Sequence, residues 1–160
     1  MAIELVVFDI DGVLTDGKVY VDHLGNESKS FLLTDIDALN EIRSMGYKIA
    51  AVTGEDTPIV EVFKNKAEWD MFYSGCKNKL VAIKEMESIW SLQPEDICYI
   101  GDGKYDVEPI KYVGTGVCPG NAISAVKSVA DIRLINKGGE GCIGELLDYL
   151  KTRRCEDNQS

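Results

Sequence analysis

Two aspartates with one residue between them follow the first apolar run of this chain, residues 3–8, and directly precede Gly12. The run predicts a buried parallel strand. Because residues i and i+2 of an extended chain point to the same side, Asp9 and Asp11 would project together from the end of that strand. Two close carboxylates resist joint ionisation, and Mg²⁺ relieves this conflict because it prefers oxygen ligands. The alternative is an acidic turn, since aspartate and glycine are common turn residues.

Two later segments could bind an anion such as phosphate. Thr53 and Gly54 follow the apolar residues 49–52, where a hydroxyl and backbone N–H groups suit a phosphate, although an ordinary turn also explains the pair. Lys77 and Lys79 lie at the start of a predicted helix, where a cation opposes the helix dipole unless an anion is nearby. We interpret Lys79 as a candidate ligand and Lys77 as a solvated surface lysine.

A third carboxylate follows the apolar residues 97–100. Asp102 comes after Gly101 and could join a cation that the first two aspartates hold. Asp106, one helical turn later, could pair with a lysine and orient it. These four segments each stand at the end of a predicted strand, which favours one shared site at the carboxyl edge of a sheet.

The elements that must position these groups alternate between apolar strands and helical patterns, which predicts a parallel sheet covered by helices. The main strands are predicted over residues 3–8, 47–52, 69–73 and 97–100, and the main helices over residues 36–45, from 57 onward, 79–90 and 142–151. A β-hairpin is predicted around Gly25 and Asn26. The expected fold class is α/β, a three-layer doubly wound parallel sheet with a small hairpin after its first strand. A single domain is expected over residues 1–152, with a polar C-terminal tail over 153–160.

The composition excludes several classes of protein. A chain of 160 residues with 45% hydrophobic and 28% charged residues is typical of one globular domain. The net charge of −10 argues against a nucleic-acid partner. The chain has no apolar run of about 18 residues and no signal-peptide pattern, so we expect a cytoplasmic protein without a membrane partner. The five cysteines lack C-x-x-C spacing, which suits a reducing compartment.

The scarcity of histidine limits the chemistry further. The single histidine, His23, lies at the predicted hairpin tip. Ser-His-Asp catalysis and histidine-rich zinc sites need imidazoles that this chain mostly lacks. Any reaction must therefore use carboxylates, lysine, hydroxyls and a metal.

The ordered set of Asp-x-Asp, Thr, Lys and Gly-Asp-x-x-x-Asp resembles the haloacid dehalogenase superfamily of phosphohydrolases. The chain looks most like the capless 3-deoxy-octulosonate 8-phosphate phosphatase group, a likeness that runs from about residue 5 to residue 150. It is carried by residues 9–17, the hairpin, Gly75 with Lys79-Leu80, Ala130-Asp131 and residues 137–141. The group includes phosphatases of nine-carbon sugar acid phosphates. The resemblance implies a Mg²⁺-dependent homotetramer in which hairpins and tails of neighbouring subunits cover the site.

The resemblance also implies a role for each matching carboxylate. Asp9 corresponds to the nucleophile that forms an aspartyl-phosphate. Asp11 corresponds to the general acid/base, which protonates the leaving alkoxide and then activates water. Mg²⁺ would be held by the Asp9 carboxylate, the Asp11 backbone carbonyl and Asp102.

The remaining matches concern the phosphate group of the substrate. Thr53, with Gly54 beside it, and Lys79 correspond to the phosphate-binding residues. Asp106 corresponds to the residue that supports this lysine and the metal shell.

Three residues depart from the pattern of the octulosonate enzymes. Gly103 stands where many relatives have a second aspartate that serves the outer metal shell, and Ile36 stands where a small residue is usual. Glu55 replaces the usual arginine, and with Lys66 in the following helix it resembles phosphatases for 2-keto-3-deoxynononate 9-phosphate. Alternatively, Glu55 only caps the helix that begins near Thr57, and Lys66 is a solvated surface residue.

The sequence thus favours a Mg²⁺-dependent phosphatase for an eight- or nine-carbon α-keto sugar acid phosphate, with the nononate type preferred. One alternative is a phosphatase of broad specificity for small phosphate esters. Another is a non-catalytic oligomerisation module of the same family, although such modules tend to lose the acidic residues that are present here.

Overall fold

The apolar runs predicted as strands form one sheet in the computed structural model, which describes residues 2–159. Six strands pair in parallel in the order β5-β4-β1-β6-β7-β8. All residues of the central strand β1 are buried, as expected for an apolar run with partners on both sides. The bounds of these strands are Leu5–Phe8 (β1), Lys48–Val52 (β4), Met71–Tyr73 (β5), Ile97–Ile100 (β6), Thr115–Cys118 (β7) and Ile132–Arg133 (β8).

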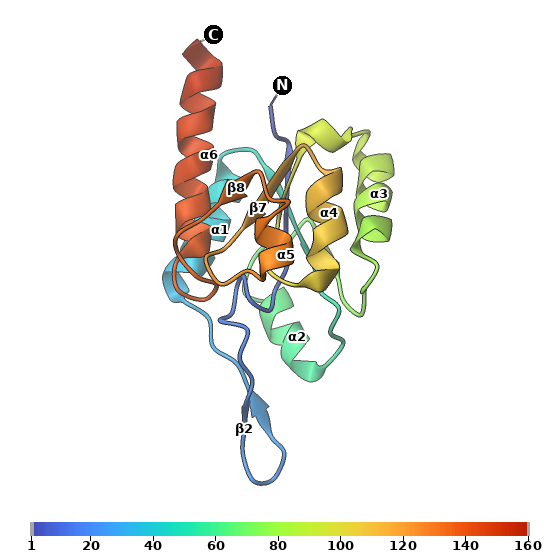
Figure 1. The fold of residues 1–160 in the computed structure, drawn as a ribbon, viewed down its shortest axis with the longest axis vertical. Coiled ribbons are helices and arrows are strands. Elements are labelled where there is room, and N and C mark those ends of the chain that lie inside the picture. The colour runs from blue at the N-terminus through green and yellow to red at the C-terminus, as the bar shows by residue number, and fades with distance from the viewer. Residues whose placement is uncertain (1, 160) are drawn as a thin grey trace.

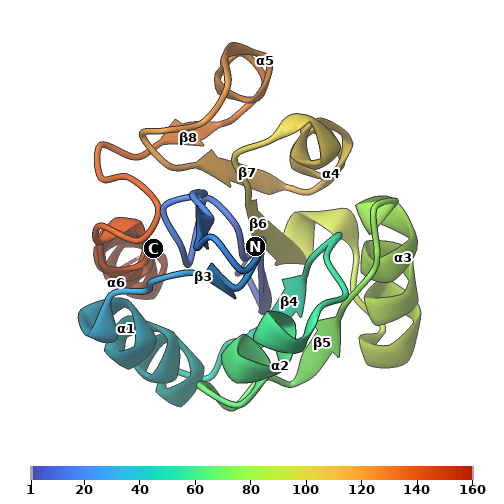
Figure 2. The ribbon, with the colours of Figure 1, turned by 90° about the horizontal axis from the view of Figure 1, so that it is seen from below.

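Successive side chains of β1 point to opposite faces of the sheet, and helices cover both faces (Figure 2). Val6 and Phe8 belong to one core cluster and Leu5 and Val7 to the other. The first cluster is completed by helices α1 (Leu33–Ser44), α2 (Pro58–Lys64) and α6 (Cys142–Gln159). The second is completed by α3 (Lys79–Trp90), α4 (Val107–Tyr112) and α5 (Ser124–Lys127). The predicted three-layer doubly wound fold is therefore confirmed.

The register of the central strands brings their carboxyl ends to one level. Phe8, the last residue of β1, lies opposite Ala51 of β4 and Ile100 of β6. The predicted site residues lie in the loops that follow these strands. Asp9 comes directly after β1, and Thr53 comes directly after β4. These loops therefore meet at the carboxyl edge of the sheet, where open α/β sheets bind ligands.

The hairpin predicted after β1 is present and projects away from the body of the molecule (Figure 1). Its antiparallel strands are β2 (Tyr20–Val21) and β3 (Glu27–Ser28). The second strand ends at Ser28, and α1 begins at Leu33. The first turn of α1 contains Asp35, a favourable charge at a helix N-terminus. Within the described chain, only this hairpin and its connections lie between β1 and α1, so no large cap is inserted there.

Helix α6 continues to Gln159 and so passes the predicted end at residue 151. Arg153 donates a hydrogen bond of 3.1 Å to the Tyr149 hydroxyl, one turn earlier in α6, and one of 3.5 Å to Thr115 Oγ1 of β7. Arg154 donates one to the carbonyl of Met45, the residue that ends α1. These contacts tie the start of the predicted tail to the body and explain why it stays helical. Among residues 2–159, no helix has both the length and the apolar character needed to cross a membrane.

Candidate active site

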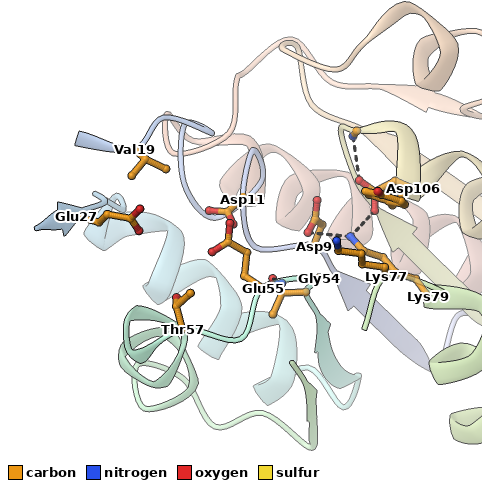
Figure 3. Close-up of a pocket in the computed structure, with 13 residues that line it drawn as sticks. Asp9, Asp11, Val19, Glu27, Gly54, Glu55, Thr57, Lys77, Lys79 and Asp106 are labelled. Atoms are coloured by element: carbon orange, nitrogen blue, oxygen red, sulfur yellow. Dashed lines mark hydrogen bonds and ion pairs between the residues drawn. The ribbon is translucent and has the colours of Figure 1, made fainter. Parts of the chain in front are cut away.

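A cavity of about 590 Å³ opens at the carboxyl edge of the sheet, within the size range of small-molecule sites (Figure 3). Its walls come from the loops after β1 and β4, the hairpin, the start of α3 and the segment after β6. Lys66, which was predicted in the helix after Glu55, lies in the turn beyond the end of α2 at Lys64 and is not part of these walls. Its ammonium lies over the ring of Phe31, 5.4 Å from the ring centroid. The predicted site residues that line the cavity are Asp9, Asp11, Thr53, Gly54, Glu55, Lys79 and Asp106.

A buried ammonium links two buried carboxylates at the base of this cavity. Lys79 Nζ lies 3.0 Å from Asp9 Oδ1 and 2.8 Å from Asp106 Oδ1 (Figure 3). Burial opposes the charge on Lys79, but the two carboxylates outweigh burial and raise the pKa of its ammonium. Lys79 is the first residue of α3, so these anions resolve the conflict between its charge and the helix dipole.

Asp106 is the most heavily hydrogen-bonded carboxylate of the site. It accepts hydrogen bonds from the backbone N–H groups of Asp102 and Gly103, over 3.0 and 2.9 Å, and from the Tyr99 hydroxyl. Burial opposes its ionised form, but Lys79 and these donors outweigh burial and lower the pKa of Asp106. Asp106 therefore remains an anion that holds Lys79 in place. Tyr99 was not anticipated from the sequence, because a tyrosine inside a buried strand looks like ordinary core.

Three carboxylates, those of Asp9, Asp102 and Asp106, each bring an oxygen within 4.8 Å of the others. Burial is the main reason why the pKa of Asp9 is well above its usual value, and the charge of Asp106 adds to it. Burial also raises the pKa of Asp102 to about 6. A cluster that resists ionisation in this way is suited to a hard cation, and carboxylate oxygens are the donors that Mg²⁺ prefers.

The backbone beside this cluster leaves no room for a side chain. Gly12 has φ 85°, and a Cβ atom added there would lie 1.8 Å from Asp102 Oδ2. A Cβ atom at Gly101 would lie 2.3 Å from Asp106 Cγ. The two glycines therefore allow the carboxylates of Asp102 and Asp106 to lie against the backbone at the strand ends. With three carboxylate oxygens gathered there, the residues present fit a bound magnesium ion. The expected ligand from the Asp11 backbone carbonyl stays a prediction.

The side chain of Asp11 belongs to a second group of charges. Lys29 Nζ lies 2.9 and 3.1 Å from its two carboxylate oxygens and 3.4 Å from Glu55 Oε2. Only 3% of the Lys29 side chain is exposed. Burial opposes its charge, yet the contacts with Asp11 and Glu55 outweigh burial and raise the pKa of Lys29. Sequence reasoning missed this lysine, because no motif marks it and 18 positions separate it from Asp11.

The loop after β4 supplies a hydroxyl and a backbone that are both held in place. Thr53 is buried, and its Oγ1 accepts a hydrogen bond of 3.2 Å from the Glu55 N–H. At Gly54, an added Cβ would lie 3.3 Å from Lys77 Cγ, so the glycine allows the two loops to pack closely. Lys77 is exposed, as expected of a surface lysine, and it also lines the cavity.

Comparison with known proteins identifies the family of this chain. The haloacid dehalogenase-like hydrolase family matches residues 55–144. The 3-deoxy-D-manno-octulosonate 8-phosphate phosphatase KdsC of Yersinia pestis is 30% identical over 148 residues, which cover 92% of this chain and 79% of that protein. The chain belongs to the haloacid dehalogenase-like hydrolases. The protein is thus an enzyme of a hydrolase family, in the branch of the capless phosphatases.

Solved structures place this hydrolase in the same branch. A probable YrbI family phosphatase of Pseudomonas syringae is 33% identical, with a TM-score of 0.90 over 94% of this chain and 86% of that one. The 3-deoxy-D-manno-octulosonate 8-phosphate phosphatase of Moraxella catarrhalis is 25% identical, with a TM-score of 0.87 over 92% and 85%. The latter structure contains a magnesium ion, a phosphate ion and a KDO molecule. The expectation of an α/β hydrolase without a large cap is confirmed.

Proposed function

We propose that this protein is a Mg²⁺-dependent phosphatase that hydrolyses the phosphomonoester of an eight- or nine-carbon α-keto sugar acid. One observation carries the proposal: the buried carboxylate of Asp9 stands at the end of β1, 3.0 Å from the Lys79 ammonium, in a cavity that Asp11 also lines. A nucleophile, a cation for phosphate and an acid/base group therefore share one site.

The reaction follows from the order of these groups. An Asp9 oxygen attacks phosphorus, and the bond between phosphorus and the ester oxygen breaks as Asp11 protonates the leaving alkoxide. Asp11, now ionised, removes a proton from water, which attacks the aspartyl-phosphate and releases phosphate from Asp9. A magnesium ion held by Asp9, Asp102 and the Asp11 backbone carbonyl would neutralise charge on the phosphoryl group.

The phosphate would bind at the lysine end of the cavity. Lys79, Thr53 and the backbone at Gly54 offer a charge and hydrogen-bond donors there, and Asp106 fixes the lysine. The phosphate and magnesium ions bound by the Moraxella catarrhalis relative support this assignment. Replacing Asp9 by asparagine should abolish phosphate release and leave the melting temperature close to that of the wild type. Undiminished turnover by this variant would exclude Asp9 as the nucleophile.

The other end of the cavity would bind the sugar acid. Glu27 and Glu55 line it, and Thr57 Oγ1 has no hydrogen-bond partner among the described residues although it is buried (Figure 3). Carboxylates and a free hydroxyl suit the hydroxyl groups of a polyol. Glu55 stands where the octulosonate enzymes usually have arginine, and this inversion of charge supports a preference for 2-keto-3-deoxynononate 9-phosphate. Lys66 has no contact with this end in the single chain, so its role in specificity stays a prediction.

The substrate is tested by measuring phosphate release from both sugar acid phosphates in the presence of Mg²⁺. We expect the nononate ester to have the higher kcat/KM, and Glu55→Arg to lower this preference by about tenfold or more. Glu55→Gln is the control that removes the charge without inverting it. Equal turnover of many small phosphate esters would instead favour the broad-specificity phosphatase. No cleavage of any ester would favour the non-catalytic module.

We also propose that the protein is a homotetramer. The hairpin carries exposed apolar side chains, among them Tyr20, Val21 and Leu24, which are 52%, 62% and 74% exposed. Such side chains on a projecting element suit contact with another subunit. Light scattering coupled to size-exclusion chromatography measures the mass directly, and a monomer of 17.7 kDa would contradict the proposal.

A further inference from the structure

Lys29 contacts Asp11, the proposed acid/base residue, but it has no role in the proposed reaction. It follows β3 on the return arm of the hairpin, and its ammonium reaches back to both oxygens of Asp11 at 2.9 and 3.1 Å. The side chain of Lys29 is 3% exposed, whereas those of Asp11 and Glu55 are 31% and 43% exposed. The lysine is therefore the fixed member of the group, and the carboxylates are the ones that solvent reaches.

We propose that Lys29 is a positioning residue, which holds the carboxylate of Asp11 in the orientation from which it transfers a proton to the leaving oxygen. The inference rests on the proposed phosphatase function. Lys29 exchanges no proton itself. It keeps its ammonium protons in both half-reactions, while the proton that reaches the alkoxide comes from Asp11 and is replaced by one from water.

The contacts of Asp11 show why a positioning residue is needed. Besides Lys29, the side chain of Asp11 receives one hydrogen bond from residues 2–159, that of Thr15 Oγ1, which is long at 3.4 Å. A half-exposed carboxylate with a single long contact can rotate, and proton transfer requires a defined orientation. A charged donor that bonds both oxygens restricts this rotation more strongly than a neutral one.

The carboxylates around Lys29 also support a positioning role. Glu55 Oε2 contacts the same ammonium as Asp11, so both carboxylates lie around one cation. Without that cation, the two negative groups would repel each other, and Asp11 would turn towards solvent. Lys29 therefore also couples the acid/base residue to the residue proposed for substrate choice, and it makes the hairpin arm part of the active site.

A comparison of leaving groups tests this role. An alkoxide leaving group needs the proton from Asp11, whereas nitrophenolate leaves as a stable anion without it. In Lys29→Met we therefore expect kcat/KM for the alkyl ester, the preferred sugar acid phosphate, to fall by about 10- to 100-fold, because kcat/KM reports the departure of the leaving group and not the water step that both substrates share. The kcat/KM for p-nitrophenyl phosphate should change by less than about threefold. Lys29→Arg, which keeps a cation, should restore most of the alkyl activity.

Two further variants separate positioning from general damage. Lys18→Met changes an exposed lysine in the first arm of the hairpin, and both substrates should be cleaved at wild-type rates. In an Asp11→Asn background, Lys29→Met should cause no further loss with the alkyl ester, because the residue it positions is already inactive. If Lys29→Met unfolds, Lys29→Gln is measured in its place, since it keeps a hydrogen-bond donor.

Each outcome decides between the alternatives. An equal fall with both substrates, no fall with either, or a full further loss in the Asp11→Asn background would overturn the role of Lys29. Failure of the wild-type enzyme to cleave any phosphate ester would instead overturn the proposed function. The two failures are therefore distinguishable in the same set of measurements.

Discussion

Replacing Gly12 by alanine is expected to displace Asp102 and weaken the magnesium site. The added Cβ would lie 1.8 Å from Asp102 Oδ2, whereas ordinary van der Waals contact begins near 3.4 Å. The carboxylate must therefore withdraw by about 1.6 Å, the difference between these two distances. Such a shift takes its oxygen out of the cluster that it forms with Asp9 and Asp106.

The expected loss of stability in Gly12→Ala has two causes, backbone strain at position 12 and weaker binding of Mg²⁺. Gly12 has φ 85°, in the left-handed region, where an alanine costs about 1–2 kcal/mol. Loss of a group that supports a metal site typically weakens binding by about 10- to 100-fold. At a Mg²⁺ concentration of about 100 times the wild-type Kd, the metal stabilises the fold by about 2.7 kcal/mol, and a hundredfold weaker site would leave about 0.4 kcal/mol.

Gly17→Ala is the matched control for this experiment. Gly17 has a similar φ of 80°, but the nearest atom to an added Cβ is 3.6 Å away, so the variant introduces backbone strain without touching Asp102. Calorimetric titration with Mg²⁺ measures the affinity, and thermal unfolding with and without Mg²⁺ measures the stabilisation. Both variants should unfold at lower temperature, and only Gly12→Ala should lose the stabilisation by Mg²⁺. Equal Mg²⁺ affinity of the two variants would refute the argument.

Three other substitutions test separate parts of the structure. Gly103→Asp should be tolerated and should bind Mg²⁺ several-fold more tightly, because an added Cβ meets nothing closer than 3.9 Å and the new carboxylate enters the outer metal shell; calorimetric titration measures this. Tyr99→Phe removes a hydrogen bond to the buried Asp106 and should lower the free energy of unfolding in urea by about 1–3 kcal/mol; an unchanged value would show that the contact adds no stability. Arg154→Ala removes the bond to the Met45 carbonyl and should cost about 1 kcal/mol, with faster amide hydrogen exchange at the end of α6; unaltered exchange there would contradict the tie to the body.

Much of the fold could be predicted because it depends on local patterns. Continuous apolar runs indicate strands buried on both faces, and the spacing of helical residues indicates the layers that cover them. The end of α6 was not predictable in this way. Residues 153–159 are polar and show no apolar stripe at helical spacing. They are helical in the structure, where Arg154 bonds to the carbonyl of Met45, 109 positions away in the chain.

The site residues also differ in whether local sequence patterns could predict them. Asp9, Asp102 and Thr53 could be found because each follows an apolar strand, and parallel strands end at a common edge. Lys66 illustrates the opposite case. Its predicted position in the helix after Glu55 suggested a shared site, but α2 ends at Lys64, and the turn that follows places the Lys66 ammonium over Phe31. Sequence proximity does not show where a helix ends or which way the chain turns after it.

The sequence by itself determined the α/β sheet and the acidic and basic residues at its carboxyl edge, because hydrophobic periodicity and strand ends are local properties of the chain. Only the tertiary structure decided which charges meet. Lys79 lies between Asp9 and Asp106, while Lys29 is buried against Asp11. Both lysines are ordinary cations in the sequence. Their partners depend on where the hairpin arm and the start of α3 pack, and that packing involves residues far apart in the chain.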